Sequence, residues 1–301
     1  MQKIKPFLWF DHQAEEAVKF YSSLFENSRT LRIERYGAAG SEVAERPMGS
    51  VMSIEFQLAG QEFVALNGGP LFTFTPAISF FVNCSSRKEI DGLWERLVQR
   101  GEVMMELAQY PFGERYGFLT DRFGVSWQLM LSDQPVEKKI VPALLFANEQ
   151  YGKAELAIQF CTSVFKDSRL IRIHRYGPDE GQPEGAVAHA VFELQGEPFI
   201  AMESNLEHDF KFILYTSFVV SCRTQEEVDY FWKALSQGGE TSQCGWLTDS
   251  FGVSWQVVPT ILDELIADSD PARSERVMQA MLKMTKLDGK ATLAAILDDL
   301  A

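Results

Sequence analysis

Two glutamines occupy positions where an amide side chain can bind a ligand. Gln128 and Gln256 each end the sequence Phe-Gly-Val-Ser-Trp-Gln, and each follows a tryptophan in an apolar strand. A buried amide needs hydrogen-bond partners, because an unpaired polar group in the interior costs stability. These residues are therefore the best candidates for contacts to a bound molecule. The alternative is that their amides bond the backbone of a neighbouring loop.

The other reactive side chains form no recognisable catalytic motif, so the catalytic residues are unknown. The sequence has no Ser-His-Asp order, phosphate-binding loop or nucleophile elbow. Its histidines are His12 at a helix start, His174 and His189 on separate strands, and His208 in a loop. The four cysteines lack C-x-x-C spacing, so we expect buried free thiols.

The chain repeats itself, which supplies an internal control for every candidate. Residues 28–37 return as 168–177, and residues 119–128 return as 247–256. Trp127 and Trp255 lie 128 positions apart but the earlier repeats lie 140 apart, so the first half holds extra residues. These fall mostly within 103–115, where we expect a loop. The repeat and the length predict a first domain at 1–132, a linker at 133–139, a second domain at 140–262 and a helical tail at 263–301.

Each half is predicted to contain two successive copies of the order strand, helix, three strands. In the first half, apolar spacing predicts helices at 14–25 and 86–100, the second capped by Ser85 or Ser86. Strands are predicted at 7–10, 30–36, 50–58, 62–66, 77–82, 102–107, 116–121 and 126–131. In the tail, Asp270-Pro271 and Asp288 are predicted helix starts.

Alternation along the strands selects the residues that face a cleft. In a cupped sheet one face packs on helices and the other lines the cleft. The candidate ligand-binding residues are Trp9, Glu55, Asn67, Phe81 and Gln128 in the first half, and His189, Glu203, Tyr215 and Gln256 in the second. Glu55 could instead face water, and Phe81 could belong to the core.

Acidic and basic candidates find little support in the repeat. Glu55 or His189 could act as a general base. The halves differ there, however, because Val191 stands opposite Glu55 and Ser53 opposite His189. Asp121 and its counterpart precede Phe-Gly turns, and we expect both to shape those turns.

Composition excludes several partners. The formal net charge of −14 argues against nucleic acid, whose phosphates bind clustered Lys and Arg. No apolar run approaches the roughly 18 residues that span a bilayer. The N-terminus lacks the apolar core of a signal peptide. We therefore expect a cytoplasmic protein with no membrane or nucleic-acid partner.

The opening and closing motifs of each half resemble the vicinal oxygen chelate superfamily, the glyoxalase and bleomycin-resistance fold, and within it the PhnB-like branch. Phe7-Leu8-Trp9-Phe10, followed by 14–17 and Phe20-Tyr21, resembles the opening of that branch. Residues 121–128 resemble its closing signature, which 249–256 repeat. The resemblance covers about 1–132 and 138–262. It implies an α+β fold of tandem glyoxalase-like βαβββ modules, in two barrel-like units with a C-terminal helical tail, and a cleft built within each unit.

The same resemblance implies a divalent metal held by His, Glu or Gln on four strands. Carried over strand by strand, those positions fall near Pro6, at Ala65 or Asn67, Ala77 and Gln128, and then near Pro142, at Ala201 or Glu203, Tyr215 and Gln256. Each half offers at most two donors, whereas stable sites usually need three or four. We therefore predict no metal and no other cofactor, although a site shared between the domains stays open.

Three functions remain to be separated. The first is metal-independent binding of a small-molecule ligand in the cupped-sheet cleft, which we favour. The second is a divalent-metal-dependent enzyme acting on vicinal oxygens, of isomerase, lyase or dioxygenase type. The third is an interaction module that uses the helical tail. PhnB-like proteins are often labelled 3-demethylubiquinone 3-methyltransferase, but no Gly-rich turn suggests a site for S-adenosylmethionine. Whether the chain is an enzyme and whether it forms a homodimer stay open.

Overall fold

The computed structural model describes residues 2–71, 73–132, 138–268 and 270–289, which form four successive modules. The first module holds β1 (Ile4–Phe10), α1 (Ala14–Leu24), β2 (Arg29–Arg35), α2 (Ala38–Ala44), β3 (Val51–Leu58) and β4 (Gln61–Asn67). The second holds β5 (Ile78–Cys84), α3 (Arg87–Leu97), β6 (Glu102–Tyr110), β7 (Gly113–Thr120) and β8 (Ser126–Leu131). The third holds β9 (Ile140–Ala147), η1 (Asn148–Gln150), α4 (Ala154–Val164), β10 (Arg169–Arg175), β11 (Val187–Leu194) and β12 (Glu197–Ser204). The fourth holds β13 (Thr216–Cys222), α5 (Gln225–Leu235), β14 (Glu240–Thr241), β15 (Trp246–Thr248) and β16 (Ser254–Pro259).

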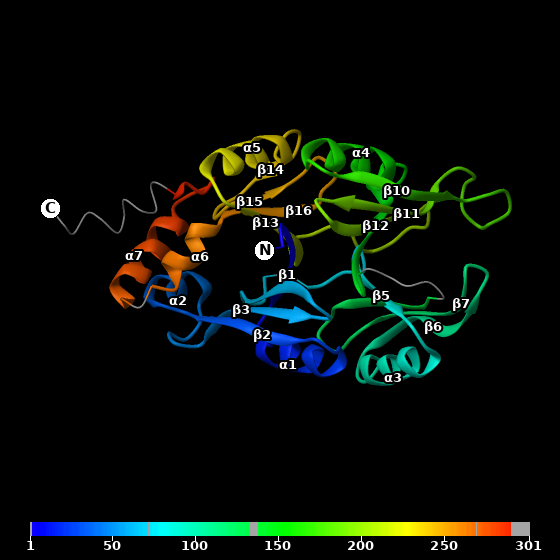
Figure 1. The fold of residues 1–301 in the computed structure, drawn as a ribbon, viewed down its shortest axis with the longest axis horizontal. Helices are drawn as coiled ribbons and strands as arrows, with labels where there is room; N and C mark the ends of the chain where they lie inside the picture. Colours follow the sequence, from blue (N-terminus) through cyan, green and yellow to red (C-terminus); the bar gives the residue numbers. More distant parts are fainter. Residues whose placement is uncertain (1, 72, 133–137, 269, 290–301) are drawn as a thin grey trace.

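The modules pair across the two halves of the sequence. Within the described residues, sheet A has the order β14-β15-β16-β13-β1-β4-β3-β2, and sheet B has the order β10-β11-β12-β9-β5-β8-β7-β6. The join is antiparallel in both sheets, at β1 with β13 and at β5 with β9. The expectation that a cleft is built within each half is therefore wrong. Each sheet, and the face it presents, combines the first half with the second (Figure 1).

The helices explain why the sequence nevertheless divides into two repeats. α1 and α3 pack on one outer side of the molecule and α4 and α5 on the other (Figure 1). The first pair covers a core around Trp127, and the second covers a core around Trp255. Ser86 caps α3 by accepting a hydrogen bond from the Glu89 backbone N–H, which confirms the predicted helix start. The helix-side cores thus stay almost entirely within the halves while the sheets cross between them.

Asp121 in the first half and Asp249 in the second each form buried hydrogen bonds within one of these cores. The Asp121 carboxylate accepts hydrogen bonds from Tyr21 Oη at 2.8 Å and Trp127 Nε1 at 2.9 Å. It also accepts from the backbone N–H groups of Phe123 and Val125. The second half repeats this arrangement around Asp249 without the tyrosine contact. These bonds give the Phe-Gly turns the shape that the sequence indicated.

Two local elements differ from the sequence expectations. Residues 103–115 form most of the β6–β7 hairpin rather than a loop, with Tyr110 paired to Gly113. Pro111 lies in the turn, where its missing N–H disturbs no strand hydrogen bond. In the second half the corresponding strands β14 and β15 are short. α2 was not expected from the sequence at all.

The tail begins with α6, three residues before the expected bound at 263, and crosses one end of sheet A; the helix start expected at Asp270-Pro271 is present. α6 (Thr260–Ile266) follows β16, and α7 (Pro271–Leu282) starts with Asp270 accepting a hydrogen bond from the Ala272 N–H. Val277 and Leu287 pack with Leu262 in a separate apolar cluster. The helix expected after Asp288 falls largely on residues 290–301, outside the described part, as do residues 133–137 of the expected linker. No described helix is long and apolar enough to cross a membrane.

Candidate functional site

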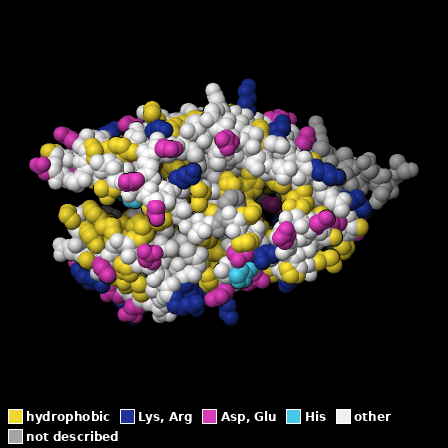
Figure 2. Space-filling model, turned by 180° about the vertical axis from the view of Figure 1, so that it is seen from behind, with side chains coloured by type: hydrophobic (Ala, Val, Ile, Leu, Met, Phe, Trp, Pro, Cys, Tyr) yellow, Lys and Arg dark blue, Asp and Glu magenta, His cyan; other side chains and the backbone are white. Residues whose placement is uncertain are grey.

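Each eight-stranded sheet carries its pair of covering helices on one face, which leaves the other face of each sheet free of α1, α3, α4 and α5 (Figure 1). We call the helix-free face of sheet A cup A and that of sheet B cup B. Side-chain alternation sets the lining: Trp127 and Leu129 pack toward the helices, so Gln128 faces cup B. Figure 2 shows a hollow at the end of the molecule opposite the tail, with hydrophobic side chains gathered along its lower side.

Cup B has an apolar lining with one chain of neutral polar groups at its floor. Its buried apolar residues are Phe81, Tyr116, Phe118, Val141, Ala143 and Ile200. Tyr116 Oη donates a hydrogen bond of 2.7 Å to Gln128 Oε1. Gln128 Nε2 in turn donates a hydrogen bond of 2.8 Å to Ser79 Oγ. The Gln128 side chain is thus held by side chains from β7 and β5, and not by a loop backbone.

Two polar side chains of cup B, Tyr116 and His189, stay uncharged near neutral pH. Burial, with smaller effects from Tyr110 and Tyr176, raises the pKa of Tyr116 far above its ordinary value. Burial, together with the nearby Arg172 and His174, lowers the pKa of His189 to about 4. Both residues are therefore hydrogen-bonding groups rather than charges at physiological pH.

Three of the predicted ligand-binding residues meet in cup B. Phe81 on β5, Gln128 on β8 and His189 on β11 come from both halves of the chain. Phe81 pairs with Gln128 in the β5–β8 register. The His189 ring stands edge-on to the Phe81 ring, with centroids 6.0 Å apart.

Cup A repeats the polar floor but surrounds it with charge. Gln256 Nε2 donates a hydrogen bond of 3.0 Å to Ser217 Oγ. This contact matches the one from Gln128 to Ser79 in cup B. Lys5 Nζ lies 2.9 Å from Glu62 and 3.7 Å from the candidate Glu55. Asp263 of α6 lies 3.9 Å from Arg32 on the opposite part of the sheet. The tail therefore brings an acidic side chain across the mouth of cup A.

Of the two remaining aromatic candidates, Trp9 lies at cup A and Tyr215 packs against Phe74, which borders the core around Trp127. The Trp9 and Trp246 rings are 5.9 Å apart, and Trp9 Nε1 donates a hydrogen bond to the Gly69 carbonyl. Tyr215 is buried just before β13, with its ring 5.5 Å from that of Phe74.

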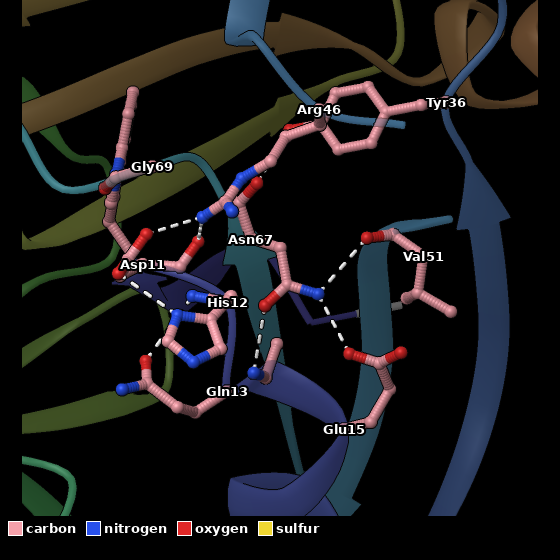
Figure 3. A network of polar contacts seen from close by, with 11 residues as sticks. Asp11, His12, Gln13, Glu15, Tyr36, Arg46, Val51, Asn67 and Gly69 are labelled. Atoms are coloured by element: carbon pink, nitrogen blue, oxygen red, sulfur yellow. Dashed lines mark hydrogen bonds and ion pairs between the residues drawn. The ribbon is translucent and has the colours of Figure 1, made fainter. Parts of the chain in front are cut away.

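Asn67 and Glu203 do not line either cup, which corrects their assignment from strand alternation. Asn67 lies on the helix side of β4, where its Oδ1 accepts a hydrogen bond of 2.8 Å from the Ala14 N–H at the start of α1 (Figure 3). Its amide nitrogen donates to the Val51 carbonyl and to Glu15. Glu203 similarly accepts from the backbone N–H groups at the starts of α4 and β11. Both residues satisfy orphan helix donors, so their role is structural.

The comparisons with known proteins agree with this architecture. Residues 2–130 and 138–258 each match the family described as 3-demethylubiquinone-9 3-methyltransferase. The chain belongs to this family. A putative 3-demethylubiquinone-9 3-methyltransferase, PhnB protein, from Bacillus cereus is 44% identical over 44% of this chain and 100% of its own, with a TM-score of 0.41.

A structural likeness extends across both halves of this PhnB-like protein. Glyoxalase I from Zea mays covers 89% of this chain and 97% of its own, with a TM-score of 0.57 and 12% identity. At that identity the likeness shows the fold alone, which is the vicinal oxygen chelate fold. A comparison with curated proteins finds no match to this chain.

The assembled cups do not offer the donors that a divalent metal of this superfamily needs. In cup B the four central strands contribute Val141 and Ala143, Ile200, Ser79 and Phe81, and Gln128. Of these, the glutamine and serine carry neutral oxygens and the rest carry no ligating atom. No group of three His, Cys, Asp or Glu in the described residues could hold a metal ion. Because stable sites usually need three or four good donors, the residues present do not fit such a group.

Sequence reasoning missed Ser79, Tyr116 and the aromatic side chains of the β6–β7 hairpin. Tyr116 reaches Gln128 only because β7 pairs with β8, with Tyr116 opposite Met130 and Phe118 opposite Gln128. The signal that could have found the hairpin was the length difference between the halves, combined with the aromatic residues at 110, 112 and 116.

Proposed function

We propose that this PhnB-like protein binds an uncharged small molecule in cup B and does so without a metal. The observation that carries the proposal is the Tyr116–Gln128–Ser79 chain, a set of neutral hydrogen-bonding groups next to the apolar side chains of cup B. Ligand sites are typically concave and apolar, with a few placed polar groups that orient the ligand.

The floor of cup B has hydrogen-bonding capacity beyond its internal contacts. An amide nitrogen carries two hydrogens and a serine hydroxyl both donates and accepts. Gln128 uses one amide hydrogen toward Ser79, and its oxygen accepts from Tyr116. The second amide hydrogen and the His189 ring can therefore bond a carbonyl or hydroxyl group of a ligand.

Cup B is a better candidate for the ligand-binding site than cup A, because the helical tail crosses cup A. The tail brings Asp263 across cup A, where Lys5 already pairs with Glu62. The hollow in Figure 2 lies at the end of the molecule opposite the tail, where β6, β7, β10 and β11 of sheet B lie. We also propose that this binding takes place in the cytoplasm, where buried cysteines without disulfide partners, such as Cys84, Cys161 and Cys222, are usual.

A ligand screen by thermal melting tests the proposal. A ligand at 100 times its Kd stabilises the folded state by roughly 2.7 kcal/mol, which gives a measurable rise in Tm. The screen is run on the full chain and on Gln128→Leu, with Gln256→Leu as the matched control in cup A. We expect hits whose shift disappears in Gln128→Leu and persists in Gln256→Leu. A broad screen without any hit, or hits that depend only on Gln256, would overturn the proposal.

A further inference from the structure

The helix side of the first half carries an arginine stacked on two phenylalanine rings. Phe20 of α1 and Phe123 of the Phe-Gly turn, which we call the first ring pair, have centroids 5.9 Å apart and an interplanar angle of 56°. The Arg122 guanidinium carbon lies 4.4 Å from the centre of the Phe20 ring and 4.8 Å from that of Phe123. Glu16 Oε1 lies 3.2 Å from the same guanidinium and holds it in place. The first ring pair therefore binds a cation that its own chain supplies.

The second half repeats the two rings but not the cation. Phe160 of α4 and Phe251 occupy the equivalent positions and form the second ring pair, with centroids 5.8 Å apart and an interplanar angle of 51°. Ser250 replaces the arginine, and Leu156 replaces the glutamate. Within the described part of the chain, no lysine or arginine stands over either ring of this pair. The second half thus keeps the geometry of the arginine site without an arginine to fill it.

The second ring pair is accessible from solvent. Phe160 and Phe251 are half-buried and border the core around Trp255. Leu156 lies one turn before Phe160 on α4, so the two side chains share a helix face. The leucine is 56% exposed, where the first half has a charged side chain. Covering this surface with a partner's side chain removes apolar area from water, which favours binding.

Charge and shape select the side chain that fits the second ring pair. The faces of aromatic rings carry negative potential and attract cations. The formal net charge of −14 attracts a basic partner and repels an acidic one. A guanidinium is planar and stacks on rings, whereas an ammonium is a compact and strongly hydrated charge. The exposed Leu156 can also pack along the methylene groups of an arriving arginine, so arginine is favoured over lysine.

We propose that the second ring pair is a docking site for an arginine side chain of a basic partner protein. The arriving guanidinium takes the place over Phe160 and Phe251 that Arg122 takes over the first ring pair. The site lies on the helix side of the molecule, away from the faces that form cup A and cup B. It is therefore independent of the proposed ligand binding and adds a protein partner to it.

An NMR titration of the full chain, with labelled phenylalanine rings, tests the docking site. The probes are a short capped peptide of Gly-Arg repeats and a Gly-Lys peptide of the same length and charge. We expect the ring signals of Phe160 and Phe251 to shift with the arginine peptide. We also expect that peptide to bind about twofold to fivefold more tightly than the lysine peptide, because a stacked guanidinium gains the ring contact.

Three surface variants use the two halves as controls for each other. Ser250→Arg supplies the missing cation from the same chain, so the arginine peptide should bind about twofold to fivefold more weakly and leave the second ring pair's signals unshifted. Gln159→Arg adds the same charge at an exposed position on α4 and should retain those shifts. Arg122→Ser uncovers the first ring pair, so the ring signals of Phe20 and Phe123 should begin to respond. The Tm of each variant without peptide checks that the fold is intact.

Several results would overturn the docking site. These are ring signals of Phe160 and Phe251 that stay unshifted, equal affinities for the two peptides, or equal losses of affinity in Ser250→Arg and Gln159→Arg. Ring signals that change with protein concentration alone would show that a second copy of the chain covers the rings, and would also overturn it. None of these results bears on the ligand screen for cup B, so the two proposals fail separately.

Discussion

Gln128 Nε2 donates a hydrogen bond of 2.8 Å to Ser79 Oγ and thereby ties β8 to β5 across the floor of cup B. The same amide accepts a hydrogen bond from Tyr116, so one side chain connects three strands. In cup A, Gln256 makes the corresponding contact to Ser217, and its burial is similar. The two glutamines are therefore a natural matched pair for mutagenesis.

Gln128→Leu is expected to destabilise the fold more than Gln256→Leu. The first substitution leaves the buried Tyr116 and Ser79 hydroxyls without their partner, at a cost of about 1–3 kcal/mol. The second leaves Ser217, so its cost should lie at the lower end of that range. Urea denaturation measures both differences in unfolding free energy. Equal losses would show that the Tyr116 hydrogen bond contributes nothing to stability.

Glu203→Ala is expected to lower stability by about 1–3 kcal/mol, because the Ala154 and Val187 N–H groups lose their buried hydrogen-bond acceptor. Asn67→Ala should act in the same direction at α1. Glu207→Ala, at an exposed position nearby, is the control and should change little. The comparison is made by chemical denaturation. A Glu203→Ala variant as stable as the parent would contradict the helix-start role.

Much of the fold could be predicted from the sequence, and the limits have physical causes. The repeated motifs identified the modules, and side-chain alternation correctly placed Phe81, Gln128 and His189 on one kind of face. Alternation failed for Asn67 and Glu203, because a strand end next to a helix start exposes backbone donors that attract a polar side chain to the core side. No local pattern reports that β5 pairs with β9 or β1 with β13, since such joins depend on contacts between distant segments.

The contribution of Asp249 to folding stability should change with pH in the direction opposite to that of an ordinary ion-paired carboxylate. Burial raises its pKa to about 6 in the folded state, from 3.8 for the free side chain. The folded protein therefore binds a proton before the unfolded chain does, and stability rises as the pH falls from about 6 to about 4. The increment is on the order of 2–3 kcal/mol.

Asp249→Asn removes that titrating group. Denaturation curves at pH steps between 4 and 7 should show the Asp249 increment in the parent and a flatter profile in the variant. The variant will also be less stable at every pH, because its amide nitrogen faces the Trp255 Nε1 donor. An unchanged pH profile would show that Asp249 is ionised throughout this range.

His189 should make folding stability change with pH in the direction opposite to that expected for Asp249. Its pKa is lowered to about 4 by burial and by Arg172 and His174, so the unfolded chain binds the proton first. Stability is therefore lost as the pH falls from about 6.5 to about 4, by up to roughly 3 kcal/mol. His189→Phe should remove this loss. The ring proton signals of His189 in an NMR titration should stay unchanged above pH 5, and a midpoint near 6.5 would contradict the prediction.

The crossing of the sheets also bears on how the two cups can change over time. Two identical subunits related by a two-fold axis must present identical cups, because every substitution appears in both. Here the equivalent surfaces belong to one polypeptide and are encoded separately. The charged, tail-covered cup and the neutral, aromatic one have therefore been free to diverge. A protein of this kind can keep one cup as a scaffold while selection adapts the other to a new ligand.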